Sequence, residues 1–268
     1  MTGTPVMALV RWYAEMGVDE AVAAEACNWY ALSKPQSETA TPPEERVRAS
    51  VAARAAASPG APPPMPADEA VAAAQQAAAL CRTHDELEAA VRAFEGCSLK
   101  AGARNTVFAD GVAGAELLVI GEAPGRDEDA AGKPFVGRAG QLLDRMLAAI
   151  GRSRKADTLI SNVVYWRPPG NRAPTQVEIA VCRPFVDRLI EITAPKAVLI
   201  AGGVPLQALL ALPGIMRSRG VWRTVETKGG AKVDALPIFH PAFLLRSPAH
   251  KRLAWADLLA LERRLMGS

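Results

Sequence analysis

From about residue 97 onward, the chain alternates apolar runs with amphipathic stretches. The apolar runs are short and rich in Leu, Val, Ile and Ala, and they occupy residues 116–121, 158–164, 197–201 and 235–239. Between and after them, apolar residues recur at helical spacing over residues 138–151, 174–193, 203–211 and 248–266. This alternation predicts an α/β fold with a parallel sheet covered by helices on both faces. Ligands of such sheets bind beyond the carboxyl ends of the strands, so the loops after the four runs are where we expect functional residues.

The first part of the chain has a different pattern. Residues 1–32 carry two aromatic pairs at spacings that predict a short helical segment, and residues 33–67 form a linker rich in Pro and Ala. One helix is predicted over residues 68–94, and it opens a domain that extends over residues 68–268. The N-terminal segment either packs against this domain or recruits a repair or replication protein.

Composition and charge narrow the class of protein. Half of the residues are hydrophobic, yet no apolar run reaches the length of about 18 residues that a membrane span requires. We therefore expect a cytoplasmic protein, and we separately expect it to be a monomer. Residues 1–96 carry 7 Lys and Arg against 13 Asp and Glu, whereas residues 97–268 carry 24 against 15. A basic domain behind an acidic leader suits a surface that binds phosphates, although a solvated basic face would give the same balance.

Three loops hold the candidate functional residues. The loop after the first run contains Gly121 and continues through a glycine-rich stretch to residue 140, which lets the backbone approach a ligand closely. It does not match the nucleotide-phosphate motifs, and a structural turn is the alternative interpretation. In the second loop, Asn162 offers one acceptor and two donors for reading a base edge, unless it only caps the strand.

The third loop follows the last run. His240 stands there, where a parallel-sheet enzyme places catalytic groups. Leu244 or Leu245 is suited to enter a DNA duplex as an apolar wedge, although one of the two leucines is expected in the core. The cations that follow are suited to hold phosphates; they are Arg246, Lys251 and Arg252.

Together the three loops resemble, in order and spacing, those of the family 4 uracil-DNA glycosylases. The matching strings are GEAPGRDEDAAGKPFVGRAGQLL, SNVVYWRPPGNRAPTQVEI and HPAFLLRSPAHKR, and the resemblance covers about residues 97–266. It implies a three-layer αβα sandwich around a central four-stranded parallel sheet, with a positively charged groove. It also implies a DNA-repair enzyme that flips uracil out of DNA, hydrolyses its N-glycosidic bond and so starts base excision repair. We expect such an enzyme to associate with the bacterial nucleoid.

The resemblance assigns roles residue by residue. Phe135 would stack on uracil, and Asn162 would read its edge. Glu128 would line the pocket where a thymine methyl would clash. His240 would stabilise the negative charge that develops on the leaving base, and Glu122 would stabilise the sugar cation or position water. The backbone of Gly121 and Ala123 would contact the base, and Arg172 would bind DNA.

The cysteines depart from the family pattern. The family binds a [4Fe–4S] cluster through four cysteines, whereas the corresponding positions here hold Phe94, Cys97, Trp166 and Cys182. Because Phe and Trp cannot ligate iron, we predict no cluster and no other metal or cofactor, with the two aromatics filling its volume. The alternative is a cluster that uses Cys97 and Cys182 plus non-standard ligands, with rescue by Cys81 or Cys27.

Other activities remain open from the sequence. A related branch bonds covalently to DNA through a His in an Arg-rich insertion, but the segment between Asn162 and Cys182 holds no His, so hydrolytic turnover is favoured. The alternatives are a glycosylase for another deaminated base and an inactive DNA-binding derivative. Phe135, Asn162 and His240 together favour the active enzyme, because DNA binding alone needs only the basic groove.

Overall fold

The computed structural model describes residues 65–267, so the predicted N-terminal segment and almost all of the linker lie outside the described residues. A six-stranded sheet forms the centre of the described domain, in the order β1-β3-β2-β4-β6-β5. Its strands are β1 (Ala109–Gly111), β2 (Leu117–Gly121), β3 (Thr158–Asn162), β4 (Ala197–Ala201), β5 (Arg223–Glu226) and β6 (Lys232–Ile238).

The four inner strands β3, β2, β4 and β6 are parallel, which confirms the predicted four-stranded parallel sheet. The edge strands β1 and β5 pair antiparallel to β3 and β6 and were not predicted from the sequence. Both are short, and polar residues interrupt them, so neither gives a continuous apolar run.

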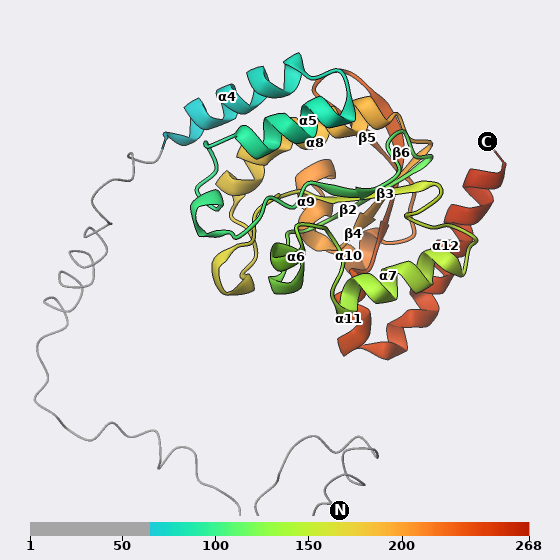
Figure 1. Cartoon of the computed structure of the whole chain (residues 1–268). Helices are drawn as coiled ribbons and strands as arrows, with labels where there is room; N and C mark the ends of the chain where they lie inside the picture. The colour runs from blue at the N-terminus through green and yellow to red at the C-terminus, as the bar shows by residue number, and fades with distance from the viewer. Residues whose placement is uncertain (1–64, 268) are drawn as a thin grey trace, which may run out of the picture. The chain divides into compact units, whose positions relative to one another are not determined.

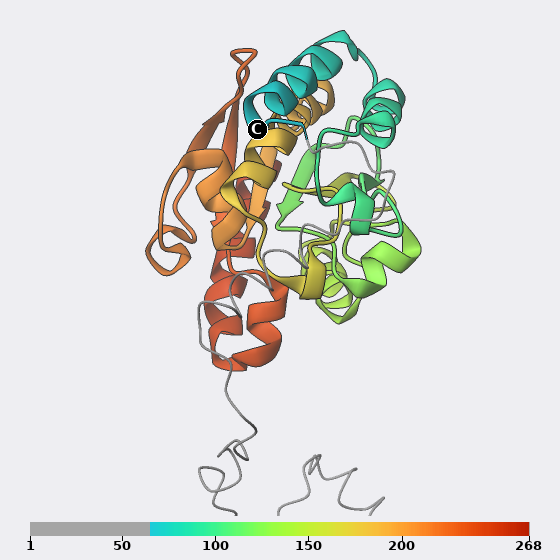
Figure 2. The same ribbon diagram turned by 90° about the vertical axis from the view of Figure 1, so that its left-hand side faces the viewer.

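Helices cover both faces of the sheet (Figures 1 and 2). The prediction of one helix over residues 68–94 is wrong, because the chain forms two helices there. The Thr83 hydroxyl accepts the backbone N–H of Glu86, and the Glu86 carboxylate accepts the N–H of Thr83, so this capping box starts a new helix. The helices are α4 (Ala67–Leu80), α5 (His84–Ala93), α6 (Arg126–Ala131), α7 (Arg138–Ala148), α8 (Gln176–Thr193), α9 (Gly203–Leu210), α10 (Ile215–Ser218), α11 (Pro241–Arg246) and α12 (Lys251–Met266).

Two hydrophobic cores follow from the alternation of side chains along the buried strands. Leu118 and Ile120 of β2 point to the layer of α4, α5, α8 and α9. Leu117 and Val119 point to the opposite layer of α7, α11 and α12. All five residues of β2 are buried, which is why the strand reads as one continuous apolar run. The result is the three-layer sandwich expected from the sequence.

The sheet brings three loops to one edge. Gly121 ends β2 directly beside Asn162, which ends β3, and β6 leads through Phe239 to His240. These three carboxyl ends carry the segments in which the sequence placed its candidate residues. Within residues 65–267, no helix has the length and apolar character that crossing a bilayer requires.

Candidate active site at the carboxyl edge of the sheet

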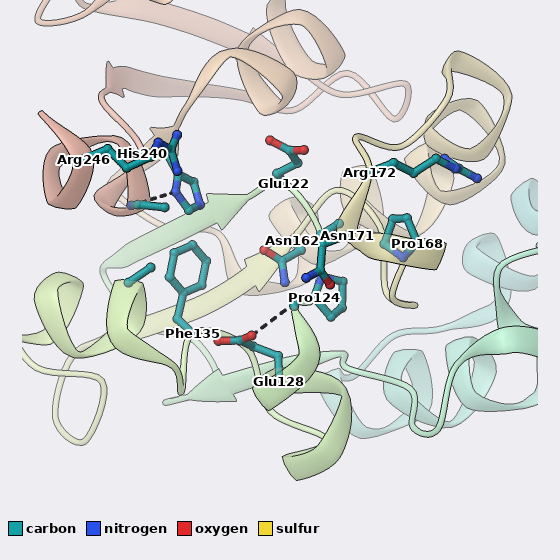
Figure 3. Close-up of a pocket in the computed structure, with 14 residues that line it drawn as sticks. Glu122, Pro124, Glu128, Phe135, Asn162, Pro168, Asn171, Arg172, His240 and Arg246 are labelled. Carbon is teal, nitrogen blue, oxygen red and sulfur yellow. Dashed lines mark hydrogen bonds between the residues drawn. The ribbon is translucent and has the colours of Figure 1, made fainter. Parts of the chain in front are cut away.

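A cavity of about 540 Å³ lies at this edge. Figure 3 shows its lining side chains. Of the residues singled out from the sequence, eight line it, namely Glu122, Ala123, Glu128, Phe135, Asn162, Arg172, His240 and Arg246. The sequence did not single out Pro124, Gly125, Ala139, Pro168, Asn171 and Ala242, which complete the wall.

Asn162 lines the cavity, whereas Gly121 does not line it but lies beside Asn162 at the end of the neighbouring strand. The Asn162 side chain is 2% exposed, and Figure 3 shows it pointing into the cavity between Phe135 and Pro124. A Cβ atom at residue 121 would lie 2.5 Å from Asn162 Oδ1 and 2.5 Å from the Phe135 ring. Only glycine therefore lets the amide and the ring approach each other across the end of β2.

Phe135 is held in an unusual backbone conformation. Its φ angle is +53°, a left-handed conformation that costs a non-glycine residue about 1–2 kcal/mol. A Cβ atom at residue 140 would lie 1.8 Å from the Phe135 carbonyl oxygen, so Gly140 lets α7 pack directly against this residue. The ring of Phe135 faces that of His240, with centroids 5.5 Å apart and planes 30° apart.

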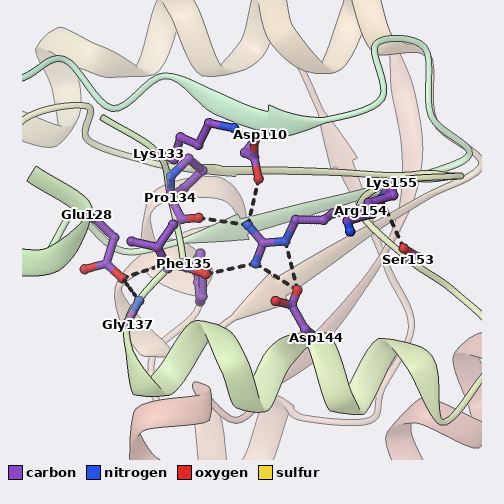
Figure 4. Close-up of polar contacts among 11 residues, drawn as sticks. Asp110, Glu128, Lys133, Pro134, Phe135, Gly137, Asp144, Ser153, Arg154 and Lys155 are labelled. Carbon is purple, nitrogen blue, oxygen red and sulfur yellow. Dashed lines mark hydrogen bonds and ion pairs between the residues drawn. The ribbon is translucent and has the colours of Figure 1, made fainter. Parts of the chain in front are cut away.

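Arg154 fixes the loop that carries Phe135 (Figure 4). Its guanidinium donates to the backbone carbonyls of Pro134 at 3.1 Å and Phe135 at 2.9 Å. It also bonds to the carboxylates of Asp110 and Asp144, at 2.9 and 2.8 Å. Because these partners lie 10 to 44 residues from Arg154 in the chain, local sequence patterns gave no signal for this role.

Glu128 holds the same loop from the other side. Its carboxylate accepts backbone N–H groups from Gly125 at 3.1 Å, Val136 at 3.0 Å and Gly137 at 2.9 Å. Glu128 lines the cavity as expected, but its carboxylate oxygens are occupied by these bonds. The side chain therefore shapes the pocket by bracing the backbone on either side of Phe135.

His240 caps α11 and presents one ring nitrogen to the cavity. Nδ1 accepts the backbone N–H of Ala242 at 3.1 Å, so the proton of the neutral ring belongs on Nε2. The pKa of His240 is lowered to about 4, mainly by burial and further by the neighbouring Arg246 cation, whereas the Glu128 carboxylate acts in the opposite direction and raises it. His240 is therefore a neutral hydrogen-bond donor near pH 7, a choice that the sequence left open.

Glu122 faces the same cavity from the end of β2 (Figure 3). Among the described residues, no group forms a hydrogen bond or ion pair with its carboxylate. Burial raises its pKa above the ordinary value for glutamate. A partly desolvated carboxylate without a partner is suited to hold water or to face a developing cation.

The structure separates the residues that were expected to contact DNA into engaged and exposed ones. Leu244 is 1% exposed and packs in the core, so it is the core leucine of the pair and not an inserting wedge. Leu245 is only partly buried. Arg172 lines the cavity, but its guanidinium donates twice to Glu178, at 2.9 and 2.6 Å. The charge of Arg172 is therefore already paired.

Lys251 and Arg252, which were also expected to bind DNA, are exposed at the start of α12.

The sequence profile of the Uracil DNA glycosylase superfamily matches residues 108–259, which include every loop of this cavity. The chain belongs to this superfamily. It is accordingly a glycosylase, a hydrolase of N-glycosyl bonds.

Similar curated proteins carry a more specific name. The Type-4 uracil-DNA glycosylase of Archaeoglobus fulgidus is 38% identical over 169 residues, which cover 61% of this chain and 84% of the relative. The Type-4 uracil-DNA glycosylase of Pyrobaculum aerophilum is 36% identical over 172 residues, 61% of this chain and 85% of the relative. That of Thermotoga maritima is 36% identical over 170 residues, 63% and 87% of the two chains.

The four positions that the resemblance assigns to cluster ligands, Phe94, Cys97, Trp166 and Cys182, all belong to one hydrophobic core. The thiols of Cys97 and Cys182 hydrogen-bond each other, which lowers the pKa of Cys97 and raises that of Cys182. The buried Phe94 ring packs against Phe185 at 5.1 Å between centroids. Trp166 is 1% exposed and donates from Nε1 to the Thr106 hydroxyl at 3.0 Å.

This donor set does not fit a [4Fe–4S] cluster, which needs about four thiolates or close substitutes. Cys81, the first rescue candidate, directs its thiol to the carbonyls of Ala77 and Glu86. Over residues 65–267, no three His, Cys, Asp or Glu side chains gather in a group able to hold a metal ion. Cys27, the second candidate, lies outside the described residues.

Proposed function

We propose that this protein is a monofunctional uracil-DNA glycosylase that works without an iron–sulfur cluster. The observation that carries the proposal is the convergence of Phe135, Asn162 and His240 on one cavity, with His240 neutral and its Nε2–H free to donate. The names of the similar proteins support uracil in DNA as the substrate.

The reaction begins with a uracil nucleotide that rotates out of the DNA, at a cost of a few kcal/mol. Its base would enter the cavity beside the Phe135 ring, whose backbone is fixed by Arg154 and Glu128. The Asn162 amide would then hydrogen-bond to the base edge. One amide offers both a donor and an acceptor, which match the O4 and N3–H of uracil, and the family resemblance assigns the discrimination against cytosine to this residue.

Bond cleavage leaves negative charge on uracil and positive charge on the sugar. His240 Nε2–H would donate to the uracil oxygen on which the charge grows, and this fixed donor is worth about 3–4 kcal/mol, by analogy with a single oxyanion-hole donor. Glu122 would face the sugar cation and hold the water molecule that attacks it. The released uracil anion is a good leaving group, so no step requires a covalent nucleophile from the protein.

The test is base release from labelled oligonucleotides that contain one uracil, thymine, hypoxanthine or xanthine. Release from the uracil substrate alone supports the proposal. Release from another deaminated base only would reassign the specificity, and failure on every substrate, single- or double-stranded, would refute the activity.

A second pair of measurements separates catalysis from folding. His240→Ala should lower single-turnover release by about 100- to 1,000-fold with little change in DNA affinity, whereas equal losses in both would make His240 structural. The purified protein should be colourless and free of stoichiometric iron. A brown protein with absorbance near 400 nm would refute the cluster-free part of the proposal.

A further inference from the structure

A second cavity, of about 400 Å³, adjoins the candidate active site. It shares Glu128, Ala139 and Asn171 with the first cavity, so the two have a common wall. Three arginines line it, from separate positions in the chain. Arg126 begins α6, Arg138 begins α7, and Arg167 lies in the loop after β3.

The acidic residues near this cavity do little to neutralise the three cations. Glu128 accepts three backbone N–H groups and so is turned to the protein. Asp129 is buried and accepts the backbone N–H groups of Arg104 and Asn105. Asp127 remains, and it meets Arg126 only in an exposed pair at 3.5 Å.

The arginines themselves have donors to spare. Within the described part of the chain, Arg138 forms no hydrogen bond or ion pair with another side chain. Arg167 uses Nε to bond to the Asn171 side chain at 2.7 Å, which orients the guanidinium and leaves its two terminal nitrogens free. By contrast, both terminal nitrogens of Arg172 bond to Glu178. The unpaired positive charge on this side of the site therefore belongs to the second cavity.

We propose that Arg126, Arg138 and Arg167 bind the backbone phosphates of the DNA strand beside the nucleotide that enters the active site. The inference rests on the proposed function, because it assumes that this nucleotide occupies the first cavity. In Figure 3, Arg246 and Asn171 lie on opposite sides of that cavity. Arg246, Lys251 and Arg252 would hold the strand on one side of the flipped base and the three arginines on the other.

Salt dependence of binding tests the proposal. The variant Arg126→Gln, Arg138→Gln, Arg167→Gln should reduce the slope of log affinity against log salt by about 2–3 on duplex DNA, because each lost phosphate contact removes about 0.9. Single-turnover release at saturating DNA should stay near the wild-type rate, since none of the three arginines lines the first cavity. The triple Arg→Lys variant should restore most of the slope.

A matched control removes the same charge elsewhere. Arg82, Lys228 and Arg263 are exposed. Residue 228 belongs to the turn between β5 and β6, at the amino end of the parallel strands, and Arg263 adjoins Arg264, which pairs with Asp234 near the start of β6. The triple Gln variant at these positions should leave the slope unchanged. Equal slope losses in both triple variants would overturn the proposal.

Single methylphosphonate linkages then locate the contact. Each linkage neutralises one phosphate beside the uracil nucleotide. At least one of them should weaken DNA binding by the wild type but cause no further loss of affinity in the arginine variant. Full additivity at every linkage would overturn the proposal. The arginine proposal and the proposed function can fail separately. A wild-type protein that releases no base can still bind DNA with a salt slope that depends on the arginines, and an active wild-type protein can bind with a slope that does not.

Discussion

The neutral state of His240 predicts a specific pH dependence of stability. The perturbation is His240→Gln, which removes the titrating group and keeps a polar side chain of similar size. In the native protein the pKa of His240 is about 4, against 6.5 for an ordinary histidine. Between these values the unfolded chain binds a proton that the native protein does not bind, so the free energy of unfolding falls as the pH decreases.

The magnitude follows from the two pKa values. At pH 7.5 both states are neutral at this residue, and its contribution to the pH dependence is close to zero. At pH 5 the unfolded histidine is almost fully protonated and the native one is mostly neutral, which destabilises the native state by about 2 kcal/mol.

The assay is urea unfolding of both proteins at pH 7.5, 6 and 5. The difference in unfolding free energy, wild type minus His240→Gln, should fall by about 2 kcal/mol from pH 7.5 to pH 5. Comparing the two proteins cancels titrations that they share. A difference that stays constant within a few tenths of a kcal/mol would refute the neutral, buried histidine and with it the tautomer argument.

Three further variants test the geometry of the site. Gly121→Ala should lower kcat/KM by about 100-fold or more, because the new methyl group displaces Asn162 and Phe135; an unchanged value for release of uracil would refute the close approach. Glu128→Gln should lower the free energy of unfolding by about 2 kcal/mol, because an amide has one acceptor oxygen for three N–H donors; unchanged urea unfolding would show that the brace is not needed. Lys251→Ala with Arg252→Ala should reduce the salt slope of DNA binding by about 2 with little change in single-turnover rate, and an unchanged slope would remove this surface from the DNA path.

The inner sheet could be predicted because β2, β3 and β4 are buried along their whole length and β6 over its last four residues, so each contributes a largely apolar run. The break between α4 and α5 was missed, although the Thr83 and Glu86 capping box is visible in the sequence. The candidate cavity could be located because strand order brings the carboxyl ends of β2, β3 and β6 to one edge. Its residues could be named mainly through the family resemblance.

The sequence could not show which polar groups are already occupied. Arg172 and Arg126 look alike as basic residues in loops, but only the folded chain reveals that Arg172 pairs with buried Glu178. In the same way Glu128 is one of four acidic residues in eight positions, and only its three backbone bonds identify it as a brace. Which charges are free depends on the folded chain, so the proposal that Arg126, Arg138 and Arg167 bind phosphates could be made only from the structure.

One of the positions that the resemblance assigns to cluster ligands, residue 166, adjoins the candidate active site. Trp166 immediately precedes the loop that carries Pro168, Asn171 and Arg172 along the cavity wall. The loop is held at its start by the buried Trp166 ring and its bond to Thr106, and at its end by the pair of Arg172 with Glu178. The first anchor is packing with a hydrogen bond, and the second is an ion pair. In the proposed cluster-free enzyme, the buried Trp166 side chain would anchor this segment by packing and by its bond to Thr106, in place of a cluster ligand.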